Sequence, residues 1–262
     1  MKKILRIIPV LFIKNGLIVR SQNFYKHQFI GNVIEQAKRL NDYDVDELVY
    51  IDITRNDNYD LGRDDLLVKS KHDIMSIIKD ISKVCFMPLT FGGGIRSVDD
   101  AVNRIRAGAD KITINSLLYK DLNIVKKIIS EIGSQAVVAS IDYKIINEKL
   151  IIFNNFGQNN TNIELIDFIK KIENLGVGEF FIQNVELDGM QKGFDLNNIK
   201  KIVNSVNLPV IACSGAGSVE HFLEAVKIKG LSAVAAGNYF NYKERSYPII
   251  KKELKNFNIN VR

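Results

Sequence analysis

Short apolar runs rich in β-branched residues alternate along the chain with longer stretches of helical periodicity. Each run is continuous, which is typical of strands that are buried on both faces of a parallel sheet. Eight such runs occur, at 4–13, 47–53, 85–90, 111–114, 136–141, 179–183, 209–212 and 232–236. The helical stretches between them include 32–40, 98–106, 122–132, 163–175, 196–206 and 219–228. Eight strands that each precede a helix predict an α/β fold, a single (β/α)8 TIM barrel over residues 1–262.

The two halves of the chain resemble each other. The run Gly93-Gly94-Ile95-Arg96-Ser97 has a counterpart in Gly215-Ala216-Gly217-Ser218, and both are followed by a helical stretch, another glycine and another strand. Residues 47–52 likewise match residues 179–184. This predicts a two-fold repeat of half-barrels with no domain boundary between them. A polar turn at 147–149 also predicts an extra hairpin at about 144–155, after the fifth strand.

The composition and charge of the chain favour an anionic ligand over nucleic acid or a metal ion. The chain has 262 residues, a net charge of +6 and lysines scattered over many predicted helix faces. No basic run alternates with aromatic residues, so we expect an anionic ligand and no nucleic acid. The two cysteines and three histidines show no metal-ligand spacing, and we expect neither a metal nor another cofactor. No stretch of about 20 apolar residues occurs, and Arg6 interrupts the apolar N-terminal run, so we expect a cytoplasmic protein without a membrane span.

Glycine-rich loops follow strands in both halves. In barrels of this class the site lies at the carboxyl ends of the strands, where glycine loops can close backbone N–H groups around a phosphate. Paired loops at matching positions therefore predict two phosphate pockets on opposite sides of the mouth, suited to a ligand that is phosphorylated at both ends. The residues assigned to them are Gly93, Gly94, Asn115 and Ser116 in the first half and Gly215, Ala236 and Gly237 in the second.

Acidic residues end several predicted strands. Asp142 ends the fifth strand and is the candidate catalytic acid or base, with a loop cap as the alternative. Its counterpart in the repeat is Phe12, which can neither donate nor accept a proton. Other candidates for orienting polar groups at the mouth are Asp52, Glu186 and Asp188. The segment 16–31, with Arg20, Lys26 and several aromatic residues, fits either a lid over an anionic ligand or a surface loop.

These motifs resemble the cyclase subunit of imidazole glycerol phosphate synthase along essentially the whole chain. The most specific stretches are 6–9, 46–53, 92–98, 107–116 and 215–222. The resemblance implies a barrel that receives ammonia from a glutaminase subunit docked on its N-terminal face and passes it to a substrate with two phosphates. It implies two catalytic aspartates, of which Asp142 is kept and Phe12 replaces the other. Met190 stands where that family has a threonine.

The same resemblance implies a gate of four charged residues at the ammonia inlet, carried over to Arg6, Glu47, Lys111 and Glu179. Asp110 would lie beside it, at the glutaminase contact. Because the inlet is kept and a catalytic carboxylate is lost, the chain is most similar to cyclase-like proteins of saccharide biosynthesis. We therefore expect an ammonia-channelling subunit that serves a sugar amidotransferase and helps convert an N-acetyl sugar of a surface polysaccharide into an acetamidino sugar.

Two alternatives remain open. One is a working cyclase subunit of histidine biosynthesis, a lyase, although the loss of one of two acid–base groups predicts little flux. The other is a phosphate-binding scaffold without ammonia transfer, against which the complete gate argues. The identity of any sugar, its binding to this barrel, and the oligomeric state beyond a glutaminase complex do not follow from the sequence.

Overall fold

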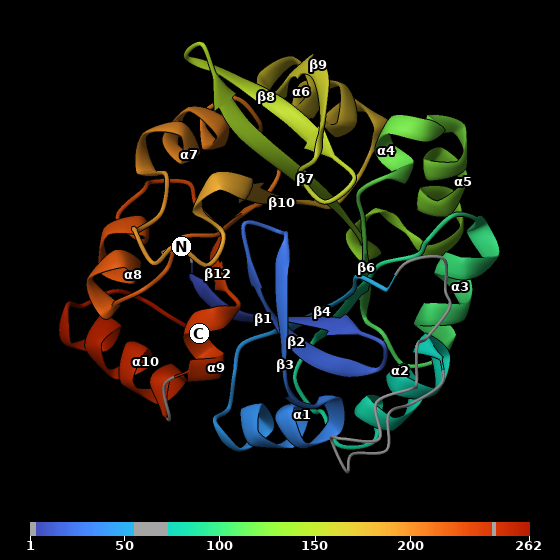
Figure 1. Cartoon of the computed structure of the whole chain (residues 1–262). Helices are drawn as coiled ribbons and strands as arrows, with labels where there is room; N and C mark the ends of the chain where they lie inside the picture. Colours follow the sequence, from blue (N-terminus) through green and yellow to red (C-terminus); the bar gives the residue numbers. More distant parts are fainter. Residues whose placement is uncertain (1–3, 55–72, 243–244) are drawn as a thin grey trace.

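Eight parallel strands close into a barrel in the computed structural model, which describes residues 4–54, 73–242 and 245–262. The strand order is β10-β11-β12-β1-β4-β5-β6-β7, and pairing of β10 with β7 closes the ring. Figure 1 looks along the barrel axis and shows the helices as an outer layer around the strands. The predicted TIM barrel is confirmed. The barrel strands are β1 (Arg6–Lys14), β4 (Leu48–Asp52), β5 (Leu89–Gly92), β6 (Lys111–Ile114), β7 (Val137–Ile146), β10 (Glu179–Asn184), β11 (Val210–Cys213) and β12 (Ala233–Ala236).

Several helices begin after a residue whose side chain accepts hydrogen bonds from their first free N–H groups. Asn32 caps α1, Asp73 caps α2, and Ser97 forms a capping box with Asp100 at the start of α3. The helices are α1 (Val33–Asp42), α2 (Ile74–Ser82), α3 (Val98–Arg106), α4 (Leu117–Lys120), α5 (Leu122–Ile132), α6 (Leu165–Leu175), α7 (Leu196–Val203), α8 (Val219–Ala225), α9 (Asn238–Tyr242) and α10 (Ser246–Asn256), with short 3-10 turns η3 (Ser134–Ala136) and η4 (Val185–Leu187).

The apolar core has two parts because each barrel strand has two buried faces. The larger part lies between strands and helices, and the smaller part fills the barrel interior. On β1 the alternation is direct: Ile7 and Leu11 face the helices, whereas Ile8, Val10 and Phe12 face the interior. Whether a side chain at the end of a strand points into the mouth or towards the helices therefore depends on whether its position is odd or even along that strand.

Two antiparallel extensions leave the barrel at equivalent points of the two halves. After β1, strands β2 (Leu17–Gln22) and β3 (Lys26–Asn32) form a hairpin that lies near the centre of the view in Figure 1. After β7, strands β8 (Lys149–Asn154) and β9 (Asn159–Glu164) extend the sheet outward. The segment 16–31 is thus regular β-structure, and the helix expected at 163–175 begins two residues later because Asn159–Glu164 pairs with β8.

The third barrel strand also starts later than the apolar run that predicted it. β5 begins at Leu89, and Phe86 in the preceding turn is 84% exposed. The Pro88 carbonyl accepts a hydrogen bond from the Leu48 N–H, which leads into the pairing of β4 with β5. Apolar character alone did not separate this turn from the strand.

Candidate functional site

Asp142 lies buried at the mouth of the barrel, held by two amides. The Asn115 side chain donates to its Oδ2 at 3.0 Å, and the Gln183 side chain donates to its Oδ1 at 3.0 Å. These partners come from β7's two neighbours, with Gln183 on β10 and Asn115 directly after β6. Both carboxylate oxygens are therefore fixed in direction before any ligand binds, which is the kind of preorganisation that acid–base catalysis requires.

The protonation of Asp142 is shifted towards neutrality. Burial raises its pKa from 3.8 to about 7, the Asn115 and Gln183 hydrogen bonds oppose that rise, and the charge of Asp188 adds to it. A carboxyl group with a pKa near neutrality can both accept and donate a proton at physiological pH. Asp142 therefore has the chemistry expected of a general acid or base.

Phe12 lies in the interior core, near the end of β1, where the resemblance implies a second carboxylate. Its ring is 8% exposed and meets Phe24 of the hairpin turn edge-on, with centroids 6.4 Å apart. A Cβ on Gly237 would lie 3.6 Å from the Phe12 ring, so this ring adjoins the loop after β12. Phe12 itself therefore offers no polar group to the mouth at this point.

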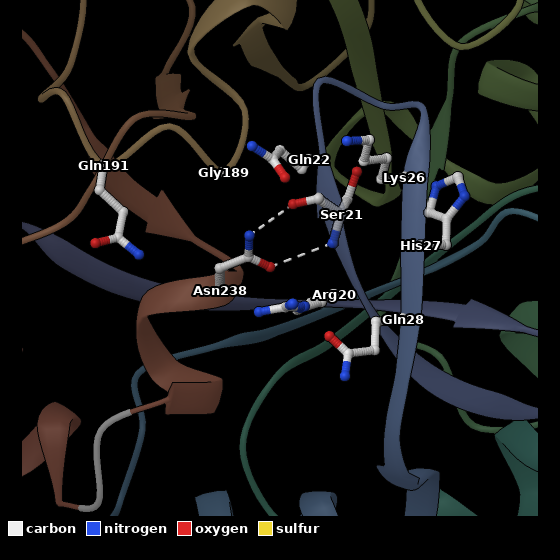
Figure 2. A pocket seen from close by; sticks show the side chains of 9 residues that line it. All are labelled: Arg20, Ser21, Gln22, Lys26, His27, Gln28, Gly189, Gln191 and Asn238. Atoms are coloured by element: carbon white, nitrogen blue, oxygen red, sulfur yellow. Dashed lines mark hydrogen bonds between the residues drawn. The ribbon is translucent and has the colours of Figure 1, made fainter.

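Asp188 holds the β2–β3 hairpin instead of pointing freely into the mouth. Its Oδ2 accepts hydrogen bonds from Ser21 Oγ at 2.7 Å and from the Phe24 N–H at 3.1 Å. Burial raises the pKa of Asp188, and both hydrogen bonds oppose the rise. The Asn238 side chain accepts from the Ser21 N–H and donates to the Ser21 carbonyl (Figure 2), so the hairpin is attached at the rim by residues that follow β10 and β12.

The remaining mouth candidates are dispersed. Asp52 ends β4, where its side chain accepts from the Thr54 N–H at 2.9 Å. Glu186 is exposed in η4 and accepts from the Ile145 N–H at 3.3 Å, which places it against the β7–β8 extension. Arg20 lies on β2. Of these three, only Arg20 lines the pocket of about 470 Å³ that opens beside the β2–β3 hairpin (Figure 2).

The first glycine loop is shaped by close backbone contact. Gly93 has a φ of +97° and Gly94 a φ of +62°. A Cβ on Gly93 would lie 2.0 Å from the Asp52 carbonyl oxygen. The buried Arg104 of α3 donates to the Gly93 carbonyl at 2.7 Å and so fixes the loop from below. Ser116 is exposed beside Asn115, so the loop, the amide and the hydroxyl group lie on the same rim.

The second glycine loop repeats this geometry. Gly215 has a φ of +94°, and a Cβ there would lie 2.0 Å from the Gly193 carbonyl oxygen. Gly193 N–H donates to the Gly215 carbonyl at 2.8 Å, and Gly217 N–H donates to His221 Nδ1 at 3.1 Å. Ala236 is buried at the end of β12, with Gly237 directly after it. Both halves thus form a tight glycine turn at the carboxyl end of the barrel.

We expect Gly93→Ala to destabilise the fold by at least about 2 kcal/mol, because a Cβ disfavours positive φ and would also overlap backbone. The matched control is Gly31→Ala on β3, where a Cβ would meet nothing within 4 Å. That change should stay within about 1 kcal/mol of the wild type. Urea unfolding measures both. Equal destabilisation by the two substitutions would contradict the steric origin of the glycine requirement.

Four charged side chains meet at the opposite end of the barrel. Arg6 binds Glu47 at 2.5 Å and also binds Glu179, while Lys111 binds Glu47 at 3.1 Å and Glu179 at 3.0 Å. Each cation touches both anions, so the charges alternate around a closed ring. Glu47 and Glu179 are buried, and Thr90 Oγ1 donates a further bond to Glu47 at 3.0 Å.

The two glutamates of the ring stabilise the charged form of Arg6. Burial alone would lower the pKa of Arg6, but Glu179 and Glu47 outweigh it and the pKa is raised. Asp110, beside the ring, is exposed and accepts from the Leu89 N–H at 2.8 Å. All four residues that the family resemblance assigned to an inlet therefore converge, while Asp110 accepts a separate hydrogen bond from the backbone.

Several site residues were missed from sequence. Gln183 and Thr90 complete the surroundings of Asp142 and of the ring, and Ser21 and Asn238 attach the hairpin. A signal for Gln183 existed, because it lies two and four residues after Phe181 and Glu179 and thus on the same strand face. No local pattern pairs Ser21 with Asn238, which are 217 positions apart.

Within the part of the chain that the structure describes, no group of three or more potential ligands could hold a metal ion. None of the helices in the described ranges is long and apolar enough to cross a membrane. Residues 1–3, which precede the apolar run that Arg6 interrupts, lie outside the described residues.

Comparison with known proteins identifies the relatives. Residues 6–246 match the family described as histidine biosynthesis protein. The chain is 39% identical over 254 residues to imidazole glycerol phosphate synthase subunit HisF of Saccharolobus solfataricus, covering 96% of this chain and 94% of that protein. It is 36% identical to the HisF subunit of a Hydrogenobaculum species, with 98% of both chains covered. The HisF subunit of Campylobacter concisus is 37% identical, with 98% and 97% covered.

These relatives correct the function expected from Phe12. The expectation of a sugar-amidation subunit in polysaccharide biosynthesis is wrong, because proteins similar over nearly their whole length carry the name of the histidine-pathway synthase. The sugar amidotransferase partner rested on that interpretation and has no support. The findings favour the alternative drawn from the sequence, the cyclase subunit.

The family match covers most of the chain, and the relatives exceed 30% identity over nearly all of it. The chain belongs to the histidine biosynthesis protein family, together with the HisF subunits of imidazole glycerol phosphate synthase.

Proposed function

We propose that the chain is the cyclase subunit of an imidazole glycerol phosphate synthase, which uses ammonia from a glutaminase subunit on a phosphorylated substrate. The observation that carries this proposal is that one barrel has a charged ring at one end and a buried carboxyl group with two glycine turns at the other. One end of the barrel has the closed ring of Arg6, Glu47, Lys111 and Glu179, and the other has Asp142 between two glycine turns.

The interior between the two ends suits a neutral nitrogen nucleophile. Above the ring, the inward side chains include Ile8, Val49, Val138, Phe181 and Ile211. An apolar environment disfavours ammonium relative to ammonia, because a charged group loses its hydration there. A nucleophile that enters at the ring would therefore remain unprotonated until it reaches the polar mouth.

At the mouth, Asp142 would perform the proton transfers of ring closure. Its pKa of about 7 allows it to take a proton in one step and return it in another. Phe12 leaves this carboxyl group without the second one that the family resemblance implies. We therefore expect the same reaction at a lower rate. Compared with a barrel that carries both carboxylates, turnover should be slower by roughly 10²–10⁴-fold, the typical contribution of one acid–base group.

The two glycine turns would hold the two phosphate ends of the substrate. Their positions on opposite halves of the rim place Asp142 between them, and their backbone geometry leaves no room for a side chain at Gly93 or Gly215. Close approach of backbone N–H groups is how such turns bind phosphate oxygens.

The glutaminase would dock over the charged ring. Ammonia released into bulk water would be protonated and diluted, so a partner must cover the inlet. Because the ring is closed in the isolated barrel, docking must separate at least one of its ion pairs before ammonia can enter. We expect a one-to-one complex at micromolar concentrations and faster glutamine hydrolysis in the complex than by the glutaminase alone.

The test compares two nitrogen sources. Lys111→Ala opens the ring, so turnover driven by glutamine should fall several-fold relative to turnover driven by added ammonium salt in the same protein sample. The matched control is Lys38→Ala, which removes an exposed lysine paired with Glu35 at 2.9 Å and should leave the ratio unchanged. Chromatographic detection of the imidazole product measures both rates. Absence of product from the wild-type barrel with ammonium would overturn the cyclase role, and an unchanged ratio in Lys111→Ala would overturn the inlet.

A further inference from the structure

Asp142 and Gln183 are partners in the register of two neighbouring barrel strands. The parallel pairing of β7 with β10 places Gln183 beside Asp142, and the Gln183 amide donates to Asp142 Oδ1 at 3.0 Å. Both residues are buried, with 4% of Gln183 and 6% of Asp142 exposed. Because bulk water competes little at such a site, the hydrogen bond is stronger there than at the surface.

The equivalent positions in the first half of the barrel are apolar. In the sequence repeat Asp142 corresponds to Phe12, and Gln183 corresponds to Ile51. The pairing of β1 with β4 places Phe12 beside Ile51 in the same way, and both side chains pack in the apolar cluster of the barrel interior. One half therefore carries a carboxyl–amide pair where the other half carries an apolar pair.

Two amides set the directions in which Asp142 can accept a proton. A carboxylate has about four lone-pair sites, two on each oxygen. Asn115 donates to Oδ2 and Gln183 donates to Oδ1, so one site on each oxygen is occupied and one remains. The two amides come from opposite neighbours of β7, so together they oppose rotation of the carboxyl group. A proton of the ligand is thus accepted at the remaining sites, whose direction the amides fix.

Gln183 can be changed without altering the rim of the barrel. Asn115 is half-buried directly after β6, beside the exposed Ser116, and belongs to the rim. Gln183 lies within β10 and is buried. A substitution at Gln183 therefore tests the support of Asp142 apart from the residues assigned to phosphate.

We propose that Gln183 is a positioning residue, which holds the Asp142 carboxyl group in the orientation that exchanges a proton with the ligand. This inference rests on the proposed function, which supplies the reaction. Gln183 transfers no proton itself, because its amide acts only as a hydrogen-bond donor. The role belongs to one half of the barrel, since Ile51 stands at the equivalent position and has no donor to offer.

The titration of Asp142 reports on this contact. Burial raises the pKa of Asp142 to about 7, and the hydrogen bonds from Asn115 and Gln183 oppose the rise. The other titratable groups that interact electrostatically with Asp142 are Asp188, Cys213 and Tyr119. Burial raises the pKa of the thiol and of the phenol, so both stay neutral near pH 7 and the Asp188 carboxyl group is the neighbour that can carry charge.

Gln183→Met removes the donor and keeps a side chain of similar length. The pKa of Asp142 should rise by roughly one pH unit, because the ionised form loses a hydrogen bond. Carbon-13 NMR of the full chain with labelled aspartate carboxyl groups measures this pKa, and Asp142→Asn assigns the signal. The maximal ammonia-driven rate should fall by roughly tenfold, since the carboxyl group is no longer fixed, and the midpoint of the pH profile should move up with the pKa. A purely structural role would lower stability without moving either midpoint.

Gln183→Glu is a second variant of nearly the same shape. Two carboxyl groups at hydrogen-bond distance do not both ionise readily, so the pair should retain one proton and its upper apparent pKa should lie above that of the wild type. The matched control is Ile51→Met, which changes the equivalent position of the other half. This control should leave the titration of Asp142 as it is in the wild type.

Two results would overturn the positioning role. One is an unchanged titration of Asp142 in both Gln183 variants, and the other is an unchanged maximal rate of Gln183→Met in a barrel that forms product. Because the titration is read without turnover, the two proposals fail separately. A barrel that shows both titration shifts but forms no product refutes the cyclase role alone, and a barrel that forms product without either shift refutes the role of Gln183 alone.

Discussion

The Asp142→Asn variant should lose roughly 10²–10⁴-fold in ammonia-driven turnover, because a buried carboxyl group that can exchange a proton is replaced by an amide that cannot. Asn115 and Gln183 both donate to Asp142, so an introduced amide N–H₂ would face one of these donors in either orientation of the new side chain. The rate with saturating ammonium salt measures the effect. A variant that retained a tenth of the wild-type rate or more would remove Asp142 from the chemistry.

The pH profile gives a second readout of the same group. Burial raises the pKa of Asp142 to about 7, so its ionised fraction increases as the pH rises through neutrality. If Asp142 acts as the base in the slow step, turnover should rise over this range. The residual activity of Asp142→Asn should lack that rise.

Stability should show the opposite dependence. The folded pKa of Asp142 lies above its ordinary value of 3.8, so between about pH 4 and 7 the folded state binds more protons than the unfolded state. The free energy of unfolding therefore falls as the pH rises through this window, by a few kcal/mol at the order-of-magnitude level. Urea unfolding at the two ends of the window should show a smaller fall for Asp142→Asn.

A matched control separates the contribution of Asp142 to the pH dependence of stability from general effects of pH. The exposed Asp42, at the end of α1, can be changed to Asn with an expected effect on the free energy of unfolding under about 1 kcal/mol. Burial also raises the pKa of Asp188, which contributes in the same direction in every variant. The comparison between variants therefore isolates Asp142, and parallel pH curves for wild type and Asp142→Asn would refute its raised pKa.

Glu47→Ala should lower the free energy of unfolding by about 3 kcal/mol, because removing one member of a buried ion network leaves its partners uncompensated. Arg6 and Lys111 would share Glu179 alone, and the Thr90 hydroxyl would lose its acceptor. For a chain of this size the loss corresponds to roughly 6–12 °C in the unfolding midpoint, measurable by calorimetry.

Lys38→Ala again provides the comparison. Its pair with Glu35 is solvent-exposed, with 49% and 69% of the side chains accessible, and such pairs contribute about 0.5 kcal/mol or less. If Glu47→Ala were as stable as Lys38→Ala, the ring would be an assembly of independent surface charges instead of a buried network.

The barrel, the repeat and the candidate residues at strand ends could be predicted because they follow from patterns in the sequence. Apolar runs and helical periodicity determine the barrel, and the parity of each strand position determines which side chains face the interior. Asp142 could be assigned to the mouth because it ends a predicted strand, whereas the assignment of Arg6, Glu47, Lys111 and Glu179 to an inlet came from the family resemblance. The glycine turns were visible because only glycine fits their backbone geometry.

Tertiary structure decided what those residues do. The segment 16–31 forms a hairpin attached by Asp188 and Asn238, and Glu186 turns outward, because these outcomes depend on partners far away in sequence. The function could not be inferred from one position either. Phe12 favoured a role outside histidine biosynthesis, and the relatives contradict that interpretation. A single side chain indicates which chemistry is missing at one point. The pKa of Asp142 and the closure of the charged ring arise only when the barrel closes and brings distant strands into contact, which local sequence patterns do not encode.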